Sequence, residues 1–212
     1  MKICEIVASY GDGGLENHFV ELCNGLAANG HEVHVIIPLA FIDRFSDDII
    51  VHRLPLHLSR RNLILLWKLY NAIQNIQPNL IHAHAGKATG LLSSFKRFIP
   101  YPCVATVHNN RKNLRGYLKM DAVIGVSNGV LEMLTHPHKK VVYNGVTLPS
   151  TTLAKPAIIK KFNLSGKRPI VMAIGRLVDA KGFDILIDAW QGIEADLLLI
   201  GDGSLKGELM SQ

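Results

Sequence analysis

The feature that most constrains the fold is a strand–turn–helix–strand pattern in residues 170–203. Residues 170–174 form a short apolar run, which is typical of a strand buried on both faces. After Gly175, apolar residues recur over residues 183–190 at the spacing of one helix face. A second apolar run, residues 197–200, ends at another glycine turn. The pattern predicts a βαβ unit, in which the two strands are parallel and belong to one sheet.

Two cations follow the first strand of this unit. Arg176 comes directly after Gly175, and Lys181 lies just before the predicted helix. In open parallel sheets, ligands bind beyond the carboxyl ends of the strands. Cations beside a helix N-terminus favour a diphosphate there. Because most charged side chains simply face water, a solvated surface is the alternative interpretation for both residues.

The chain before residue 144 alternates apolar strand runs with amphipathic helix patterns, which predicts a doubly wound parallel sheet. Residues 144–168 differ, because they contain two prolines and a basic cluster, and they predict a link between domains. We therefore expect a first domain at 1–147, a linker at 148–168 and the first part of a second domain at 169–212. The expected strands are 2–8, 32–37, 49–54, 79–84, 103–108, 121–126 and 139–143, and the expected helices are 15–26, 63–76 and 86–98, with another opening at Ser127.

A glycine-rich loop follows the first predicted strand and contains Gly11, Gly13 and Gly14. Glycines between a strand and a helix let the backbone approach a ligand closely. The loop does not match the dinucleotide-binding fingerprint, because Glu16 stands at the third glycine position and strand two ends at Pro38 instead of an acid. This mismatch disfavours an NAD-dependent oxidoreductase. A tight structural turn is the alternative interpretation of the loop.

Histidines occur at the ends of two predicted strands. His84 and His108 are the last residues of their predicted strands, where the residues of a ligand cleft lie in such sheets. His82 lies two residues before the end of its strand and is expected to be structural. Metal binding is the weaker interpretation, because no third ligand is spaced with them. We therefore expect no metal.

Several segments resemble, in the same order, the motifs of retaining GT-B glycosyltransferases of family 4. They are a GG-x-E turn at 13–16, an H-x-H at 82–84, a T-x-H at 106–108, DAVIGVS at 121–127, VVYNGV at 141–146 and GRLVDAKG at 175–182. Thr147 stands where the family has an aspartate after the fifth of these segments. The resemblance covers nearly the whole chain.

The resemblance implies an α/β fold of the GT-B type. A doubly wound, parallel Rossmann-like domain on the acceptor side would precede a second Rossmann-like domain that binds a nucleotide sugar. Arg176 and Lys181, with Gly175, would hold the donor diphosphate without a metal or other cofactor. Asn144 and Gly145 would mark the hinge between the domains.

The same resemblance assigns roles in the first domain. Gly13, Gly14 and Glu16 would form a loop at the cleft. His84 and His108 would line its acceptor side, and His108 is the candidate for a contact in catalysis.

The later donor-site segments of the family, an S-x-x-E-G-F loop and an E-A-M-A-x-G-x-P-V helix, are not found before Gln212. We therefore expect a nucleotide-sugar domain that is incomplete, and little or no transferase activity from the 212-residue chain alone. Self-association through the apolar strand at 197–200 is a further expectation. The alternative is a non-catalytic remnant that binds only an acceptor or a membrane.

Basic residues are unevenly distributed along the chain. The formal net charge is +6, and no acid occurs between Asp48 and Asp121, where eleven Lys and Arg residues lie. Such asymmetry indicates an anionic partner, such as an anionic membrane, a lipid-linked phosphate, a nucleotide or a nucleic acid. Nucleic acid is disfavoured because no aromatic stacking platform accompanies the cations. A solvated basic face is the alternative.

The remaining features favour a cytoplasmic protein. No apolar run is long enough for a membrane span, and the N-terminus has the pattern of a strand and not of a signal peptide. The three cysteines are odd in number and do not have the spacing of metal ligands, which is typical of a reducing compartment. With the resemblance, we expect a transferase, peripheral on the inner face of the cytoplasmic membrane. It would move a sugar from a nucleotide-diphosphate sugar to an acceptor hydroxyl with retention, in lipopolysaccharide or other surface polysaccharide synthesis.

Overall fold

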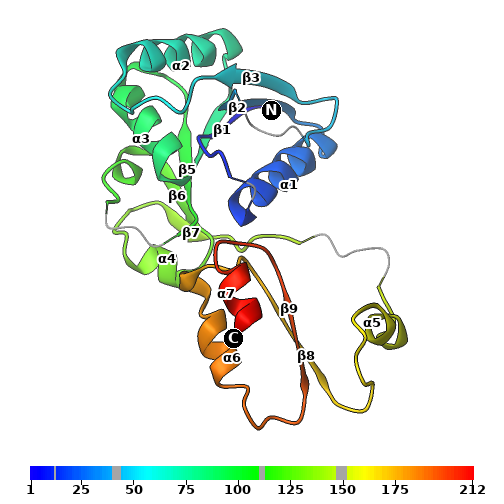
Figure 1. Cartoon of the computed structure of the whole chain (residues 1–212). Helices are drawn as coiled ribbons and strands as arrows, with labels where there is room; N and C mark the ends of the chain where they lie inside the picture. Colours follow the sequence, from blue (N-terminus) through cyan, green and yellow to red (C-terminus); the bar gives the residue numbers. More distant parts are fainter. Residues whose placement is uncertain (12, 40–43, 110–112, 147–151) are drawn as a thin grey trace. The chain divides into compact units, whose positions relative to one another are not determined.

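The computed structural model describes residues 1–11, 13–39, 44–109, 113–146 and 152–212. The chain divides into two compact units, Met1–Val146 and Thr147–Gln212, shown in Figure 1. The sequence analysis placed this boundary after residue 147. Thr147 and residues 148–151 of the expected linker lie outside the described residues.

The first unit is built on a seven-stranded sheet with the order β3-β2-β1-β4-β5-β6-β7, and every neighbouring pair is parallel. Its strands are β1 (Lys2–Val7), β2 (Glu32–Pro38), β3 (Ile50–Leu54), β4 (Leu80–His84), β5 (Cys103–Val107), β6 (Ala122–Gly125) and β7 (Lys139–Val141). Its α-helices are α1 (Gly14–Ala28), α2 (Leu63–Ile76), α3 (Ala85–Phe95) and α4 (Asn128–Glu132), with 3-10 helices at Lys96–Phe98 and Tyr117–Lys119. The topology confirms the predicted doubly wound α/β fold.

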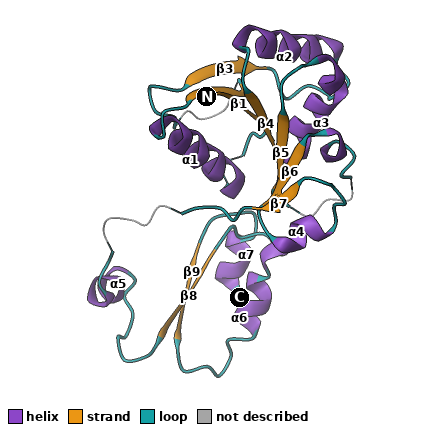
Figure 2. Ribbon diagram, turned by 180° about the vertical axis from the view of Figure 1, so that it is seen from behind, coloured by secondary structure: helices purple, strands orange, loops and turns teal. Residues whose placement is uncertain are grey.

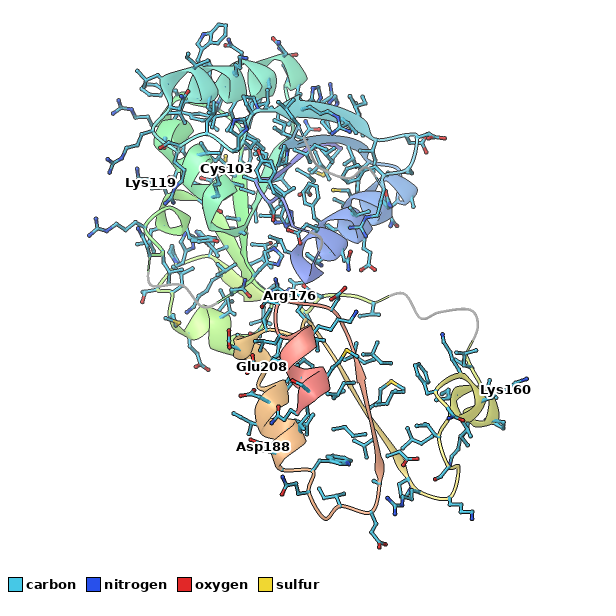
Figure 3. The ribbon with its side chains drawn as sticks, viewed as in Figure 1. Cys103, Lys119, Lys160, Arg176, Asp188 and Glu208 are labelled. Carbon is cyan, nitrogen blue, oxygen red and sulfur yellow. The ribbon has the colours of Figure 1, made fainter. Side chains whose placement is uncertain are left out.

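Helices cover both faces of this sheet, as Figures 1 and 2 show. On β1, Cys4 and Ile6 pack into the core that α2 and α3 cover, whereas Val7 packs into the core under α1. Because neighbouring side chains of a strand point to opposite faces, Glu5 is directed to the α1 face. Cys103 opens β5 and is fully buried (Figure 3).

Helix α2 shows why the sequence pattern located the helices well. The Asn62 side chain caps its first turn by accepting from the backbone N–H of Leu65 at 2.9 Å. The helix ends where Gln77 adopts a left-handed conformation with φ 51. Between these ends, one apolar stripe is buried, at Leu65, Leu69, Ile73 and Ile76.

The second unit contains a parallel two-stranded sheet of β8 (Ile170–Ile174) and β9 (Asp196–Ile200), which confirms the predicted βαβ unit. Its helices are α5 (Lys155–Lys161), a 3-10 turn at Asp179–Lys181, α6 (Phe183–Asp188) and α7 (Lys206–Ser211). Helix α6 ends at Asp188, whereas the apolar periodicity of the sequence predicted a helix that continues to Trp190. The Trp190 indole N–H donates instead to the carbonyl of Ala195 at 3.0 Å and closes the turn into β9.

In the described part of the chain, none of the helices combines the length and the apolar character that crossing a membrane requires.

Candidate functional site

The site lies where the winding of the first sheet reverses. Strands β1 and β4 are neighbours at the centre of the sheet, and the chain leaves them on opposite faces, into α1 and α3. Ligands of doubly wound sheets bind at this point, beyond the carboxyl ends of the strands. The register pairs Val7 with His84, and His84 with Thr106. His84, His108 and the loop after β1 therefore share one edge of the sheet, as predicted.

The glycine-rich loop is held together by Glu16. Its carboxylate accepts from the backbone N–H of Gly13 at 2.8 Å and from the hydroxyl of Ser9. A Cβ atom added at Gly11 would lie 3.2 Å from this carboxylate, and one at Gly13 would lie 3.3 Å from it, whereas the space at Gly14 is open. Glu16 thus shapes the turn from a buried position. These hydrogen bonds give Glu16 a structural part in the turn, and the space beside Gly14 is open. The place of Gly13, Gly14 and Glu16 at a ligand cleft stays a prediction.

A buried acid lies behind the histidines. Glu5 is 1% exposed, and its Oε2 lies 2.8 Å from Nε2 of His84 and 3.0 Å from Nδ1 of His82. The other ring nitrogen of His82 lies 2.7 Å from the hydroxyl of Thr106. His82 therefore has partners on both sides and is structural, as the sequence analysis expected.

Burial and the contacts among Glu5, His82 and His84 determine which of the buried groups are charged. Burial alone would raise the pKa of Glu5, but the charge of His82 and the hydrogen bonds from His82 and His84 outweigh it and lower the pKa to about 2. Burial, with the neighbouring His82, lowers the pKa of His84 to about 4 against the opposing effect of Glu5. Burial also lowers the pKa of His18. At neutral pH, Glu5 is an anion and His84 is a neutral imidazole.

Three histidines converge at the edge of the sheet. Nδ1 of His84 lies 3.3 Å from Nε2 of His108, and the ring of His18, on α1, lies 5.3 Å from the His108 ring between centroids. One nitrogen of each ring lies within 4.8 Å of the others. His84 is fully buried, whereas His18 and His108 are partly exposed. Ala85, the residue directly after His84, has a positive φ of 60, which is a strained conformation for a residue other than glycine.

The sequence analysis missed two members of this group. His18 was overlooked because it lies on a helix far from both strand ends in the chain, and its ring adds a third imidazole beside His84 and His108. Glu5 was overlooked inside an apolar strand, although an acid in the sequence KICEIV was itself a signal. A cavity of about 200 Å³, mostly apolar, adjoins both residues.

The cations of the second unit lie in the loop after β8, where Figure 3 labels Arg176. Arg176 and Lys181 are both exposed, and among the described residues neither has a carboxylate partner. The N–H of Gly175 donates to the carbonyl of Ile200 at 3.0 Å, which brings the loops after β8 and β9 together. The binding of a donor diphosphate by Arg176 and Lys181 stays a prediction.

The hinge assignment is also untested. Asn144 and Gly145 are exposed, follow β7, and come directly before the last residue of the first unit.

Residues 12–148 match the model of Glycosyltransferase Family 4. The chain belongs to this family. An uncharacterized glycosyltransferase of Methanocaldococcus jannaschii is 27% identical, over 91% of this chain and 57% of the relative. The lipopolysaccharide core biosynthesis glycosyltransferase LpsE of Rhizobium meliloti is 26% identical, over 93% of this chain and 59% of the relative. The chain thus spans less than two thirds of the length of these curated relatives.

Solved structures share the fold of this Family 4 chain. Anabaena Alr3699/HepE in complex with UDP and glucose superposes with a TM-score of 0.73 at 18% identity, over all of this chain and 64% of that one. The apo form of the lipopolysaccharide outer core galactosyltransferase WaaB gives a TM-score of 0.65 at 17% identity, also over all of this chain and 64% of that one. The likeness confirms the GT-B-type fold predicted from the sequence.

Proposed function

We propose that this Family 4 chain serves a glycosyltransferase reaction that moves a sugar from a nucleotide-diphosphate sugar to an acceptor hydroxyl, with retention at the anomeric carbon. The observation that carries the proposal is the pair of cations after β8, Arg176 and Lys181, which have no carboxylate partner among the described residues. Relatives of the same fold are described in complexes with UDP, which supports a nucleotide diphosphate as the ligand.

The cations would act on the leaving group. When the sugar departs, negative charge grows on the diphosphate, and a guanidinium and an ammonium placed there stabilise it. No metal is needed for this role. Removing either cation is expected to lower turnover by on the order of 10²-fold.

The first unit would receive the acceptor. His84 and His108 lie at the carboxyl edge of its sheet, as does the loop that contains Gly14, beside which the space is open. We propose that His108, which is partly exposed, contacts the acceptor hydroxyl. His84, fully buried, acts by holding His108 in place through the 3.3 Å contact between their rings.

A basic, apolar face of α2 favours a membrane-bound acceptor. Leu63, Ile64 and Trp67 are 79%, 64% and 63% exposed, and Arg60 and Arg61 lie just before Asn62, the N-cap of the helix. Apolar and tryptophan side chains beside cations are typical of a helix lying in the interface of an anionic membrane. We propose that this face holds the protein at the inner face of the cytoplasmic membrane.

Next to this face lies a cavity of about 290 Å³, with Arg60, Arg61 and Arg115 in its wall alongside Ser93 and Ser94. Guanidinium groups and hydroxyls recognise phosphate oxygens. We propose that the acceptor is a lipid-linked phosphorylated saccharide, in keeping with the lipopolysaccharide enzymes to which the chain is similar. A non-catalytic unit that binds only this acceptor or the membrane is the second candidate, because the same features of the first unit would support it.

A ligand-observed NMR screen separates the two candidates, since it detects weak binding. Nucleotide-diphosphate sugars and the matching monophosphates are screened against the 212-residue chain, and Arg176→Ala, Lys181→Ala and Lys160→Ala are compared. The proposal expects binding of a diphosphate that is lost in the first two variants and kept in the third, which removes an exposed cation elsewhere in the second unit. No binding of any nucleotide diphosphate would favour the non-catalytic candidate.

A further inference from the structure

We propose that the saccharide bound by the first unit carries two separate phosphate groups, and that two neighbouring basic cavities on helix α3 bind one phosphate each. The cations of the first cavity, described above, are Arg60, Arg61 and Arg115. The cations of the second cavity, of about 420 Å³, are Lys96, Arg97 and Lys119. Ser93 and Ser94 line both cavities, which therefore adjoin. The role of this saccharide as the acceptor rests on the proposed function, whereas the two phosphate sites do not.

One face of α3 runs along both cavities. Gly86, Gly90 and Ser93 line the first cavity, and Ser94 and Arg97 line the second. These residues recur at intervals of three or four, which is the spacing of a single helix face. A rise of 1.5 Å per residue separates Gly90 from Arg97 by about 10 Å along the axis. Phosphates bound at these two places cannot belong to one diphosphate, because its two phosphorus atoms share an oxygen.

Glycines let the first set of cations approach the helix closely. A Cβ atom at Gly90 would lie 2.9 Å from Cδ and from Nη1 of Arg60, so this side chain lies directly on α3. On another side of the cavity, a Cβ atom at Gly116 would lie 3.5 Å from Cα of Gly90. This contact brings Arg115, the residue before Gly116, to the same cavity. The two guanidinium groups can therefore bind one phosphate against the surface of the helix.

The charges of this groove are mostly unpaired. Among the described residues, Lys96 alone of the six cations has a carboxylate partner, Asp121, at 3.0 Å. Lys119, labelled in Figure 3, donates to the backbone carbonyl of Ser93 at 3.4 Å. The helix dipole favours cations at the C-terminal end of α3, which accounts for Lys96 and Arg97. It does not account for the three arginines farther toward the N-terminal end, where an anion bound between them would offset their repulsion.

The polar groups between the two sets of cations suit a sugar. The hydroxyls of Ser93 and Ser94 both donate to the carbonyl of Gly90, at 2.9 and 3.0 Å. Their oxygens therefore remain as acceptors, and a sugar hydroxyl can donate to them, whereas an ionised phosphate cannot. The side-chain oxygen of Asn113 accepts from the backbone N–H of Arg115 at 3.1 Å, so its NH2 group can donate to a sugar oxygen. A saccharide with a phosphate on each of two sugars fits this order of groups better than a chain of linked phosphates.

Pyrophosphate counts the phosphate sites, because it fits into one cavity at a time. It is titrated into the 212-residue chain and followed by amide-resolved NMR. Two sets of saturable shifts are expected in the first unit, one around Gly90 and Gly116 and the other around Lys96 and Lys119. Because each amide is resolved, any binding to residues 175–182 is seen separately. A chain that binds UDP at those residues and has no pyrophosphate site on α3 would overturn this inference alone and leave the proposed donor site.

Variants at exposed cations test the two cavities one by one. Arg115→Ala should weaken pyrophosphate binding at the first cavity by about 10-fold and leave the second unchanged, since a hydrogen bond to a charged group is lost. Arg97→Ala should have the reverse effect. Lys160→Ala, at an exposed cation of the second unit, is the control and should change neither. Shifts that do not saturate and spread over the exposed cations of both units would show general attraction to anions and would overturn both sites.

Trehalose 6,6′-bisphosphate then tests whether one saccharide bridges the cavities. It is compared with trehalose 6-phosphate by isothermal titration calorimetry. The bisphosphate should bind at least about 10-fold more tightly, because its second phosphate binds within the complex already formed. Arg115→Ala and Arg97→Ala should each reduce this advantage, and Lys160→Ala should not. Equal affinity for the two compounds, or an advantage that survives both Arg115→Ala and Arg97→Ala, would overturn the assignment of a saccharide with two phosphates.

Discussion

At the scale of single residues, the centre of the first unit is arranged around Glu5. A carboxylate buried to 1% exposure is tolerated in a core strand only when its oxygens are paired, and here His82 and His84 supply the partners. Replacing buried pairs of this kind by apolar side chains is often neutral or stabilising. The network is therefore better explained by the positions it gives to the histidines than by stability.

Glu5→Gln tests the pairing. The amide keeps the size of the side chain but loses the charge. Its NH2 group, which can only donate, would face a histidine N–H that needs an acceptor. We expect the free energy of unfolding to fall by about 2 kcal/mol, measured by urea denaturation. Glu21→Gln, an exposed acid on α1, is the matched control and should change stability by less than about 0.5 kcal/mol. Equal stability of the two variants would contradict the pairing.

The pKa values of the network predict sensitivity to acid. The pKa of His84 falls from 6.5 to about 4 on folding, and that of Glu5 from 4.5 to about 2. In both cases the unfolded chain takes up protons at a higher pH than the folded chain, so stability falls as pH falls, first between 6.5 and about 4 through His84 and then below 4.5 through Glu5. The lowered pKa values of His18 and His52 act in the same direction.

We therefore expect a lower free energy of unfolding at about pH 5 than at about pH 7.5. The measurement is chemical denaturation at each of the two pH values. His84→Gln should show a smaller difference between the two pH values. Greater stability at the lower pH would contradict the assigned protonation states.

The residues also show what the sequence could predict about the site. His84 and His108 were found because strand ends of a parallel sheet meet at one edge, which follows from the order of elements alone. Glu5 and His18 were not, because side-chain contacts between β1, β4 and α1 depend on register and helix orientation, which periodicity does not give. Glu16 was assigned to the cleft from resemblance, which stays a prediction, and its hydrogen bonds to Ser9 and Gly13 add a structural part that the sequence did not show.

At the scale of elements, the sequence predicted nearly every strand and helix of the first unit, because apolar periodicity follows from burial. Helix α2 begins at Leu63 and ends at Ile76, as expected. The errors are at ends, where local contacts decide. Strand β7 stops at Val141, and helix α3 gives way to a 3-10 turn at Lys96–Phe98.

Two glycines in different surroundings, one packed between β6 and α4 and one within α1, are expected to respond in opposite ways to alanine. A Cβ atom at Gly125 would overlap the side chain of Leu131, so Gly125→Ala should lower the free energy of unfolding by about 1–3 kcal/mol. Gly25, within α1, has open space around it, and Gly25→Ala should raise stability by about 0.5–1 kcal/mol through helix propensity. Urea denaturation measures both. A tolerated alanine at Gly125 would show that the packing of α4 differs.

The exposed face of α2 predicts binding to anionic membranes. Vesicle co-sedimentation should show binding to anionic vesicles at about 0.05 M salt that weakens at about 0.5 M, since the salt screens the cations. Trp67→Ser should reduce binding several-fold, because the ring no longer enters the interface. Met210→Ser, at an exposed apolar residue of α7, is the control and should have no effect. Equal binding to neutral and anionic vesicles would contradict the role of the cations.

At the scale of the whole molecule, the chain has two units with different characters. The first has two apolar cores on either side of its sheet. In the second, β8 exposes apolar side chains, with Ile174 72% exposed, whereas β9 is half-buried throughout. Self-association through residues 197–200 stays a prediction, and the more exposed apolar side chains of this sheet lie on β8.

The central claim is that the loop after β8 in this Family 4 chain binds the diphosphate of a nucleotide sugar. Amide-resolved NMR, during titration with UDP, tests it most directly, because it locates even weak binding along the chain. The account predicts saturable shifts that are largest in residues 175–182 and that disappear in Arg176→Ala. Shifts confined to the first unit, or shifts in residues 175–182 that Arg176→Ala leaves unchanged, would contradict it.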